Sequence, residues 1–129
     1  MEKDLRVRTK QFALRIIRLY SALPPKGATQ VLGFQILKSG TSVGAHYREA
    51  QRAKSNADFI SKIEGALQEL DETSYWLELL GDSGLVTARR LESLEREAEE
   101  LLSIFVTIVK RVKSKPSPKS KRNVEARTS

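Results

Sequence analysis

The sequence predicts an all-α protein: an up-down-up-down antiparallel four-helix bundle followed by a disordered basic C-terminal tail. Apolar residues recur at spacings of three and four along four segments, which is the period of helices with one buried face. The 129 residues contain no alternating β-branched run and no Asn-Gly or Asp-Gly hairpin turn. Short connections between the segments favour antiparallel neighbours. We therefore expect one bundle domain over residues 1–113 and a flexible tail over residues 114–129.

The first helix ends at Pro24-Pro25, because proline cannot continue the helical hydrogen bonds. Its apolar face comprises Leu5, Phe12, Ile16, Leu19 and Leu23. The second helix, over roughly residues 28–53, contains the run SGTSVGA, whose Gly40 and Gly44 alone cost about 2 kcal/mol relative to alanine. Small side chains let a neighbouring helix approach closely, and the added packing offsets that cost. We expect a continuous helix here, and the alternative is a break near these glycines.

The third helix is predicted to begin at Ser55, with Asp58 in a capping-box-like position, and to end at Gly81 in a left-handed cap. Thr87 is the predicted N-cap of the fourth helix. The fourth helix carries three heptads of apolar residues, the strongest pattern in the chain. These are Leu91, Leu94, Ala98, Leu101, Phe105, Ile108 and Val112.

Composition excludes several kinds of site. Cysteine is absent and His46 is the one histidine, so thiolate chemistry, zinc sites of the usual type and paired-histidine metal sites are ruled out. We expect no catalytic residues, no metal and no cofactor. His46 is interpreted as a histidine at the edge of the core, and Arg48 and Glu49 as partners of charged groups on the third helix. No apolar run approaches a membrane span, so a cytoplasmic protein without membrane association is expected.

Charge is distributed unevenly along the chain. Twenty-three Lys and Arg against sixteen Asp and Glu give a net charge of +7. Residues 1–22 and 113–129 are strongly basic, whereas residues 55–85 hold one basic side chain against seven acidic ones. A basic face attracts a polyanion through counterion release, and an acidic face can meet the basic face of a neighbouring subunit. The alternative is that these are solvated helix faces that maintain solubility.

Nucleic-acid binding is predicted through thirteen cations on the first helix, at the end of the second helix and in the tail. They are Arg6, Arg8, Lys10, Arg15, Arg18, Arg48, Arg52, Lys54, Lys113, Lys115, Lys119, Lys121 and Arg122. No aromatic residues interleave with them and no recognition-helix motif is present. Binding is therefore expected to address RNA or DNA phosphates, with weak sequence selectivity and strong salt dependence.

The third and fourth helices have more apolar residues than one buried face needs. The surplus predicts an oligomer interface formed by Tyr75, Trp76, Leu79, Leu102, Val106 and Val109. Large aromatic residues such as Trp76 are enriched in interface cores. The alternative is that a bundle wraps these side chains at the ends of its own core.

Three stretches stand in a specific order and spacing: residues 39–50 (SGTSVGAHYREA), 58–62 (DFISK) and 69–80 (ELDETSYWLELL). Together they resemble the four-helix-bundle family of 23S rRNA-intervening-sequence proteins, over most of residues 12–85. The pair Arg48-Glu49 matches the family pattern, whereas His46 stands where that pattern has Asn.

The resemblance implies a homo-oligomer, a pentameric ring, similar to the accessory proteins of diversity-generating retroelements. Those proteins bind a reverse transcriptase and nucleic acid through basic surface. The leading hypothesis is therefore a non-enzymatic homo-oligomer that binds RNA, as an accessory to a reverse transcriptase or another protein. The alternative is a protein-interaction scaffold without direct nucleic-acid binding.

Overall fold

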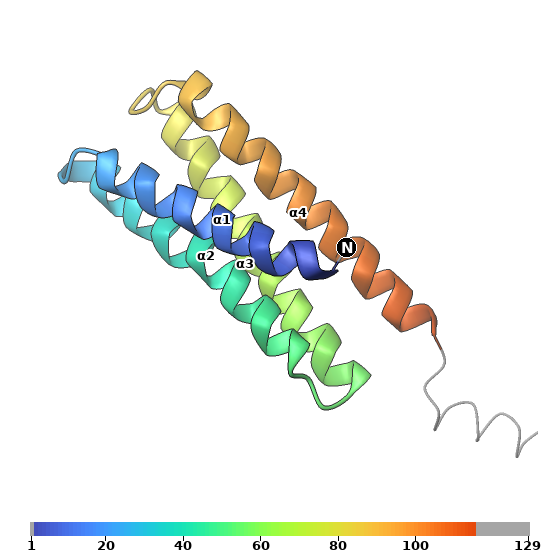
Figure 1. Cartoon of the computed structure of the whole chain (residues 1–129). Coiled ribbons are helices and arrows are strands. Elements are labelled where there is room, and N and C mark those ends of the chain that lie inside the picture. The colour runs from blue at the N-terminus through green and yellow to red at the C-terminus, as the bar shows by residue number, and fades with distance from the viewer. Residues whose placement is uncertain (1, 116–129) are drawn as a thin grey trace, which may run out of the picture.

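Four α-helices make up the part of the chain that the computed structural model describes, residues 2–115, with side chains described from Leu5 onward. They are α1 (Glu2–Ala22), α2 (Gly27–Gln51), α3 (Asn56–Asp82) and α4 (Ala88–Ser114). Successive helices run antiparallel and form an elongated bundle (Figure 1). The predicted all-α bundle is confirmed. Of the tail predicted for residues 114–129, Ser114 belongs to α4, and residues 116–129, with Lys119, Lys121 and Arg122, lie outside the described residues.

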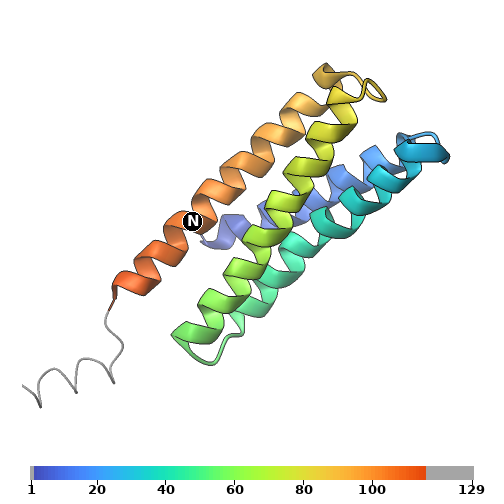
Figure 2. The same cartoon turned by 180° about the vertical axis from the view of Figure 1, so that it is seen from behind.

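The helices are arranged in chain order around the bundle. α2 packs against α1 on one side and against α3 on the other, and α3 packs against α4 (Figures 1 and 2). The contact between α1 and α4 is the smallest of the four. All four helices supply fully buried side chains to one core, among them Phe12, Ile36, Leu70 and Phe105.

The glycine-containing run of α2 is a continuous helix, as predicted. It lies against α1, with Gly40 beneath Ile16 and Gly44 beneath Thr9. A Cβ atom at position 44 would lie 3.2 Å from the hydroxyl of Thr9, so the absence of side chains lets the two backbones approach closely. The energetic penalty of glycine is thus offset by packing against α1.

The termini of α3 confirm one prediction and correct another. The Ser55 hydroxyl accepts a hydrogen bond from the Asp58 backbone N–H at 3.0 Å, so Ser55 is the N-cap. The left-handed cap expected at Gly81 is wrong: α3 continues to Asp82, and Gly84 adopts the positive φ of 77°. Gly84 has the same steric freedom three residues later, where the connection actually turns.

α1 leaves one end of the bundle uncovered. Arg8 near the start of α1 is paired with Glu97 and Glu100 in the middle of α4. Because the two helices are antiparallel, the later turns of α4 extend beyond the start of α1, as the position of the N-terminus in both views shows (Figures 1 and 2). We call this region the open end and define it by residues 47–59 and 108–115. There the heptad residues Ile108 and Val112 are only half-buried, whereas Leu91 to Phe105 are buried.

Candidate nucleic-acid interface

The predicted cations of α1 do not form one basic surface. Arg8 makes a bidentate contact with Glu97, with nitrogen–oxygen distances of 2.6 and 3.2 Å. Arg15 donates to the Ser93 hydroxyl at 2.8 Å. Positions 8 and 15 are two turns apart, so both side chains face α4 and connect the two helices. These two arginines stabilise the bundle, which leaves less of their charge for a polyanion.

The remaining cations of α1 point in other directions. Arg6 donates to the Gln51 side chain at 3.3 Å across the α1–α2 contact, and Arg18 is exposed. Lys10 and Arg48 line the same shallow hollow of about 290 Å³ between α1 and α2. The structure therefore brings together one pair, Lys10 and Arg48, that the sequence places on separate helices.

The open end gathers four of the predicted cations. Arg52 and Lys54 lie at the α2–α3 connection, and Lys113 and Lys115 lie at the end of α4; all four are exposed. Lys113 is 3.7 Å from Glu64, in a pair with both side chains more than half exposed. Among residues 2–115, no acidic side chain forms an ion pair with the other three cations. Their charge is available to an external anion.

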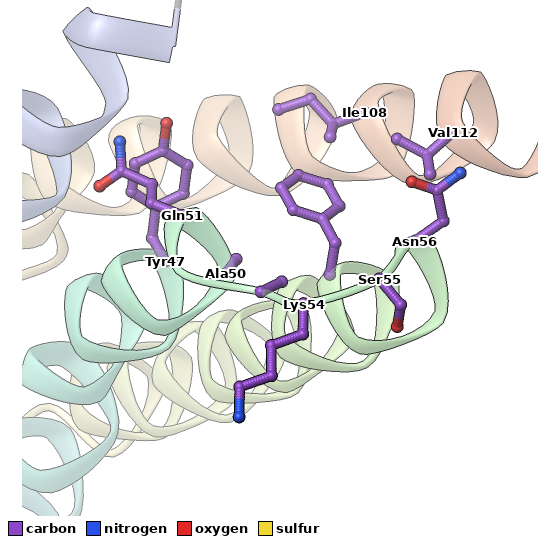
Figure 3. A pocket seen from close by; sticks show the side chains of 10 residues that line it. Tyr47, Ala50, Gln51, Lys54, Ser55, Asn56, Ile108 and Val112 are labelled. Carbon is purple, nitrogen blue, oxygen red and sulfur yellow. The ribbon is translucent and has the colours of Figure 1, made fainter.

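A cavity of about 570 Å³ lies at the open end, between the α2–α3 connection and α4 (Figure 3). Ile108 and Val112 point into it from α4; the carboxamide of Asn56 lies beside Val112, and that of Gln51 lies beside Tyr47 (Figure 3). Lys54 extends from the rim away from the cavity (Figure 3). The ten lining residues are Tyr47, Ala50, Gln51, Ala53, Lys54, Ser55, Asn56, Phe59, Ile108 and Val112.

Sequence reasoning missed this cavity and its aromatic lining. Tyr47 and Phe59 flank the cations of residues 48–54 in the sequence, but Tyr47 belongs to α2 and Phe59 to α3, so the sequence alone does not show that they line one cavity. Tyr47 is 2% exposed and its ring packs 5.8 Å from that of Phe105, centroid to centroid. The cavity exists because α1 does not cover this end, and the relative position of two distant helices leaves no local sequence signal.

The acidic side chains gather near the opposite end, where α3 ends and α4 begins. Burial raises the pKa of Glu95, and repulsion from Glu78, Glu99, Asp82 and Glu92 raises it further. A cluster that resists ionisation of one of its members carries concentrated negative charge. This acidic cluster therefore lies at the end of the bundle away from the exposed cations of the open end.

His46 lies half-buried between α2 and α3, close to the place expected from the sequence. Its Nε2 atom is 4.0 Å from Glu69, and a Cβ atom at Gly65 would lie 2.9 Å from its Nδ1 atom. Burial raises the pKa of Glu69, and repulsion from the carboxylate of Glu72 raises it further. Attraction to His46 and Lys38 lowers the pKa of Glu69 and so offsets part of this shift. Within residues 2–115, no three His, Cys, Asp or Glu side chains come together in a way that would hold a metal ion.

The predicted oligomer interface is only partly accessible. Tyr75 is 54% exposed, whereas Trp76 and Leu102 pack against the core of their own subunit. Leu79 and Val106 are half-buried. Val109 is 7% exposed and belongs to that core, so it must be removed from the predicted interface. It is buried because the heptad positions turn slowly around α4, and the buried stripe passes through residue 109 near the end of the helix.

Five exposed large apolar side chains lie on α1 and α2. They are 37–61% exposed and lie on the outward sides of these two neighbouring helices. This α1/α2 outer face comprises Val7, Leu14, Ile17, Val31 and Phe34. The spacing of seven and three on α1 marks a second apolar stripe beside the buried one, a sequence signal from which this face could have been predicted. Exposed apolar patches of this kind mark interaction surfaces.

None of the helices within residues 2–115 combines the length and apolar character that crossing a membrane requires.

Comparisons with known proteins agree with this architecture. The family model of the 23S rRNA-intervening sequence protein matches residues 3–107. A crystal structure of a protein of unknown function, from the S23 ribosomal protein family of Bacteroides thetaiotaomicron, is 40% identical in sequence, with a TM-score of 0.79. The match covers 85% of this chain and 99% of that one. None of the curated proteins matches the chain. The family match over most of the chain leads to one conclusion: the protein belongs to the family of 23S rRNA-intervening sequence proteins.

Proposed function

We propose that this protein is a non-enzymatic homo-oligomer that binds nucleic acid, RNA in particular, through the cations of the open end. The observation that carries the proposal is the set of exposed cations at one end of the bundle, where the side chains of Arg52, Lys54 and Lys115 form no ion pair with an acidic side chain of the described residues. Phosphates are the natural partners of such groups, because binding them releases condensed counterions.

RNA is favoured over duplex DNA for two reasons. The family name refers to a sequence within 23S rRNA. The cations also lie at one end of a bundle, with Lys54 at the rim of a cavity, and they do not follow one face of a single helix that could enter a major groove. An end of this shape suits looped or single-stranded segments, which are the usual targets of sequence-specific RNA recognition.

Self-association is supported by two complementary surfaces. The α1/α2 outer face is apolar and has the cations Lys10, Arg18 and Lys38 beside it on the same helices. The acidic cluster around Glu95 has the exposed ring of Tyr75 on the neighbouring helix. Docking the first face of one copy onto the second face of the next is a head-to-tail contact, and head-to-tail contacts generate rings when the rotation closes. A ring presents several open ends together and thereby raises avidity for a long polyanion.

A second candidate function is a protein-interaction scaffold, as an accessory to a reverse transcriptase or another protein. The exposed Phe34 and Val31 favour it, because apolar side chains that stand out from the surface together mark protein interfaces. In that case the α1/α2 outer face would bind the partner protein, and the cations of the open end would serve solubility alone.

Filter binding with a structured RNA across a salt series tests the leading proposal. Replacing Arg52 and Lys54 together by Gln should weaken binding. In a plot of log binding constant against log salt concentration, the slope should become less negative by about 1.4–1.8, which is the value for two lost phosphate contacts. The matched control replaces Arg89 and Arg90, exposed at the opposite end, by Gln and should change little. No binding at low salt, or an equal loss in both double variants, contradicts the proposal and favours the scaffold.

A further inference from the structure

The cavity at the open end combines three features that occur together in sites for unstacked nucleobases. It has an apolar wall formed by Phe59, Ile108 and Val112, the carboxamides of Gln51 and Asn56, and a cation at its rim. We propose that this cavity holds one base of a single-stranded RNA segment, while the cations of the open end hold the flanking phosphates. The inference rests on the proposed function and deepens it, because it names the class of ligand.

The size and the wall of the cavity suit a base. A volume of about 570 Å³ lies within the range of small-molecule sites and exceeds what water alone would need. Phe59 is half-buried and lines the cavity, so part of its ring is accessible from it, and Tyr47, which packs on Phe105, also belongs to the lining. An aromatic ring stabilises a flat base by stacking, whatever the sequence.

The polar lining matches the edges of bases. Gln51 and Asn56 each carry an amide N–H donor and a carbonyl acceptor, the pair of groups that bases present along their edges. The oxygen of Gln51 accepts a hydrogen bond from Arg6 at 3.3 Å, so its amide N–H groups are the part of this lining side chain left to donate to a ligand. Asn56 is exposed, and its carboxamide lies toward Val112 (Figure 3). The two carboxamides come from opposite sides of the α2–α3 connection.

The cations of the open end lie where the phosphates on either side of a bound base would pass. Lys54 belongs to the rim, and its side chain extends away from the cavity into solvent (Figure 3). Lys113 and Lys115 follow directly after Val112 on the α4 side. A strand with one base in the cavity therefore passes cations on both sides. An apolar small molecule would gain nothing from these charges, and a peptide would not use the phosphate-binding groups; a nucleotide strand uses both.

The test compares a 12-nucleotide single-stranded RNA of mixed sequence with an oligomer of the same length and charge in which every position is abasic. We expect the intact protein to bind the RNA about tenfold more tightly than the abasic oligomer, the contribution of one stacked base. Phe59→Leu should reduce this ratio toward one. Asn56→Ala, at an exposed position where folding is not at risk, should reduce it severalfold. Lys54→Gln should weaken both oligomers and leave the ratio unchanged.

The failure of this inference differs from failure of the proposed function. Equal affinity of the intact protein for the two oligomers, or a ratio that neither Phe59→Leu nor Asn56→Ala changes, shows that no base occupies the cavity while phosphate binding stands. Failure to bind either oligomer at low salt overturns both. Circular dichroism of Phe59→Leu, expected to match the parent, identifies any loss that comes from unfolding, and in that case the ratio measured for Asn56→Ala decides.

Discussion

Ile16 of α1 lies directly over Gly40 of α2, so closely that a Cβ atom at position 40 would be 2.7 Å from Cγ1 of Ile16. Ile16 is fully buried and β-branched, so its side chain cannot turn away without leaving a preferred rotamer. The α1–α2 distance is therefore set by a residue without a side chain, and this contact supports the two helices that carry the apolar outer face.

Gly40→Ala should destabilise the protein by about 1–3 kcal/mol, the usual cost of inserting a methyl group into a packed core. Urea denaturation measures this as a lower midpoint. The matched control is Gly81→Ala, also in a helix, where the nearest side-chain atom is 3.4 Å from the new Cβ. There the better helix propensity of alanine should leave stability unchanged or raised by up to about 1 kcal/mol. Equal effects at the two positions would show that close packing does not explain Gly40.

Glu95→Gln should stabilise the protein at neutral pH. The pKa of Glu95 is raised in the folded state, so in the range just above its usual value the folded protein binds more protons than the unfolded chain. Stability therefore falls as pH rises through the usual pKa of a glutamate and through the raised pKa of Glu95. Removing the charge should raise the free energy of unfolding at neutral pH by less than about 1 kcal/mol and have no effect near pH 3.

Urea denaturation of Glu95→Gln and Glu97→Gln at pH 7 and near pH 3 compares the effect of the two carboxylates on the free energy of unfolding. Glu97 is two residues away but paired with Arg8, so its substitution should lower stability at pH 7. If both variants shift in the same direction at pH 7, the contrast between a crowded and a paired carboxylate is wrong.

Arg8→Gln should lower stability by about 1–3 kcal/mol, because it leaves the carboxylate of Glu97, whose side chain is 17% exposed, without its ion-pair partner. It should leave RNA affinity within about twofold of the parent. The control is Arg18→Gln, an exposed cation on the same helix, which should leave stability unchanged. Chemical denaturation and filter binding of the two variants separate a structural role from a binding role. A large loss of RNA affinity in the fully folded Arg8→Gln protein would contradict this assignment.

Ile17→Glu and Phe34→Glu should lower the mass of the assembled protein, because each buries a charge in the apolar contact proposed for the α1/α2 outer face. Light scattering at micromolar concentration measures that mass. Thr107→Glu adds the same charge to an exposed position of α4, outside the α1/α2 outer face and the acidic cluster around Glu95, and should leave the mass unchanged. A parent that is monomeric under these conditions, or unchanged masses in both variants, would remove self-association from the proposal.

The sequence by itself determined the helices and most of the core. Apolar residues three and four apart define the buried face of each helix, and the N-cap at Ser55 followed from local hydrogen bonding between residues close in sequence. Even the continuous α2 was predictable, because the glycines that weaken a helix also permit close packing. These features depend on neighbours along the chain, which a single sequence displays directly.

Only the tertiary structure decided which surfaces remain available. The start of α1 lies opposite the middle of α4, and this offset alone creates the cavity and leaves Ile108 and Val112 half-exposed. The packing of α1 against α4 also divides the cations of α1 between structural pairs and solvent, and Val109 joins the core of its own subunit because the buried stripe turns around α4. Such features depend on how far two packed helices slide past each other. That offset is the outcome of many long-range contacts, and no residue encodes it locally.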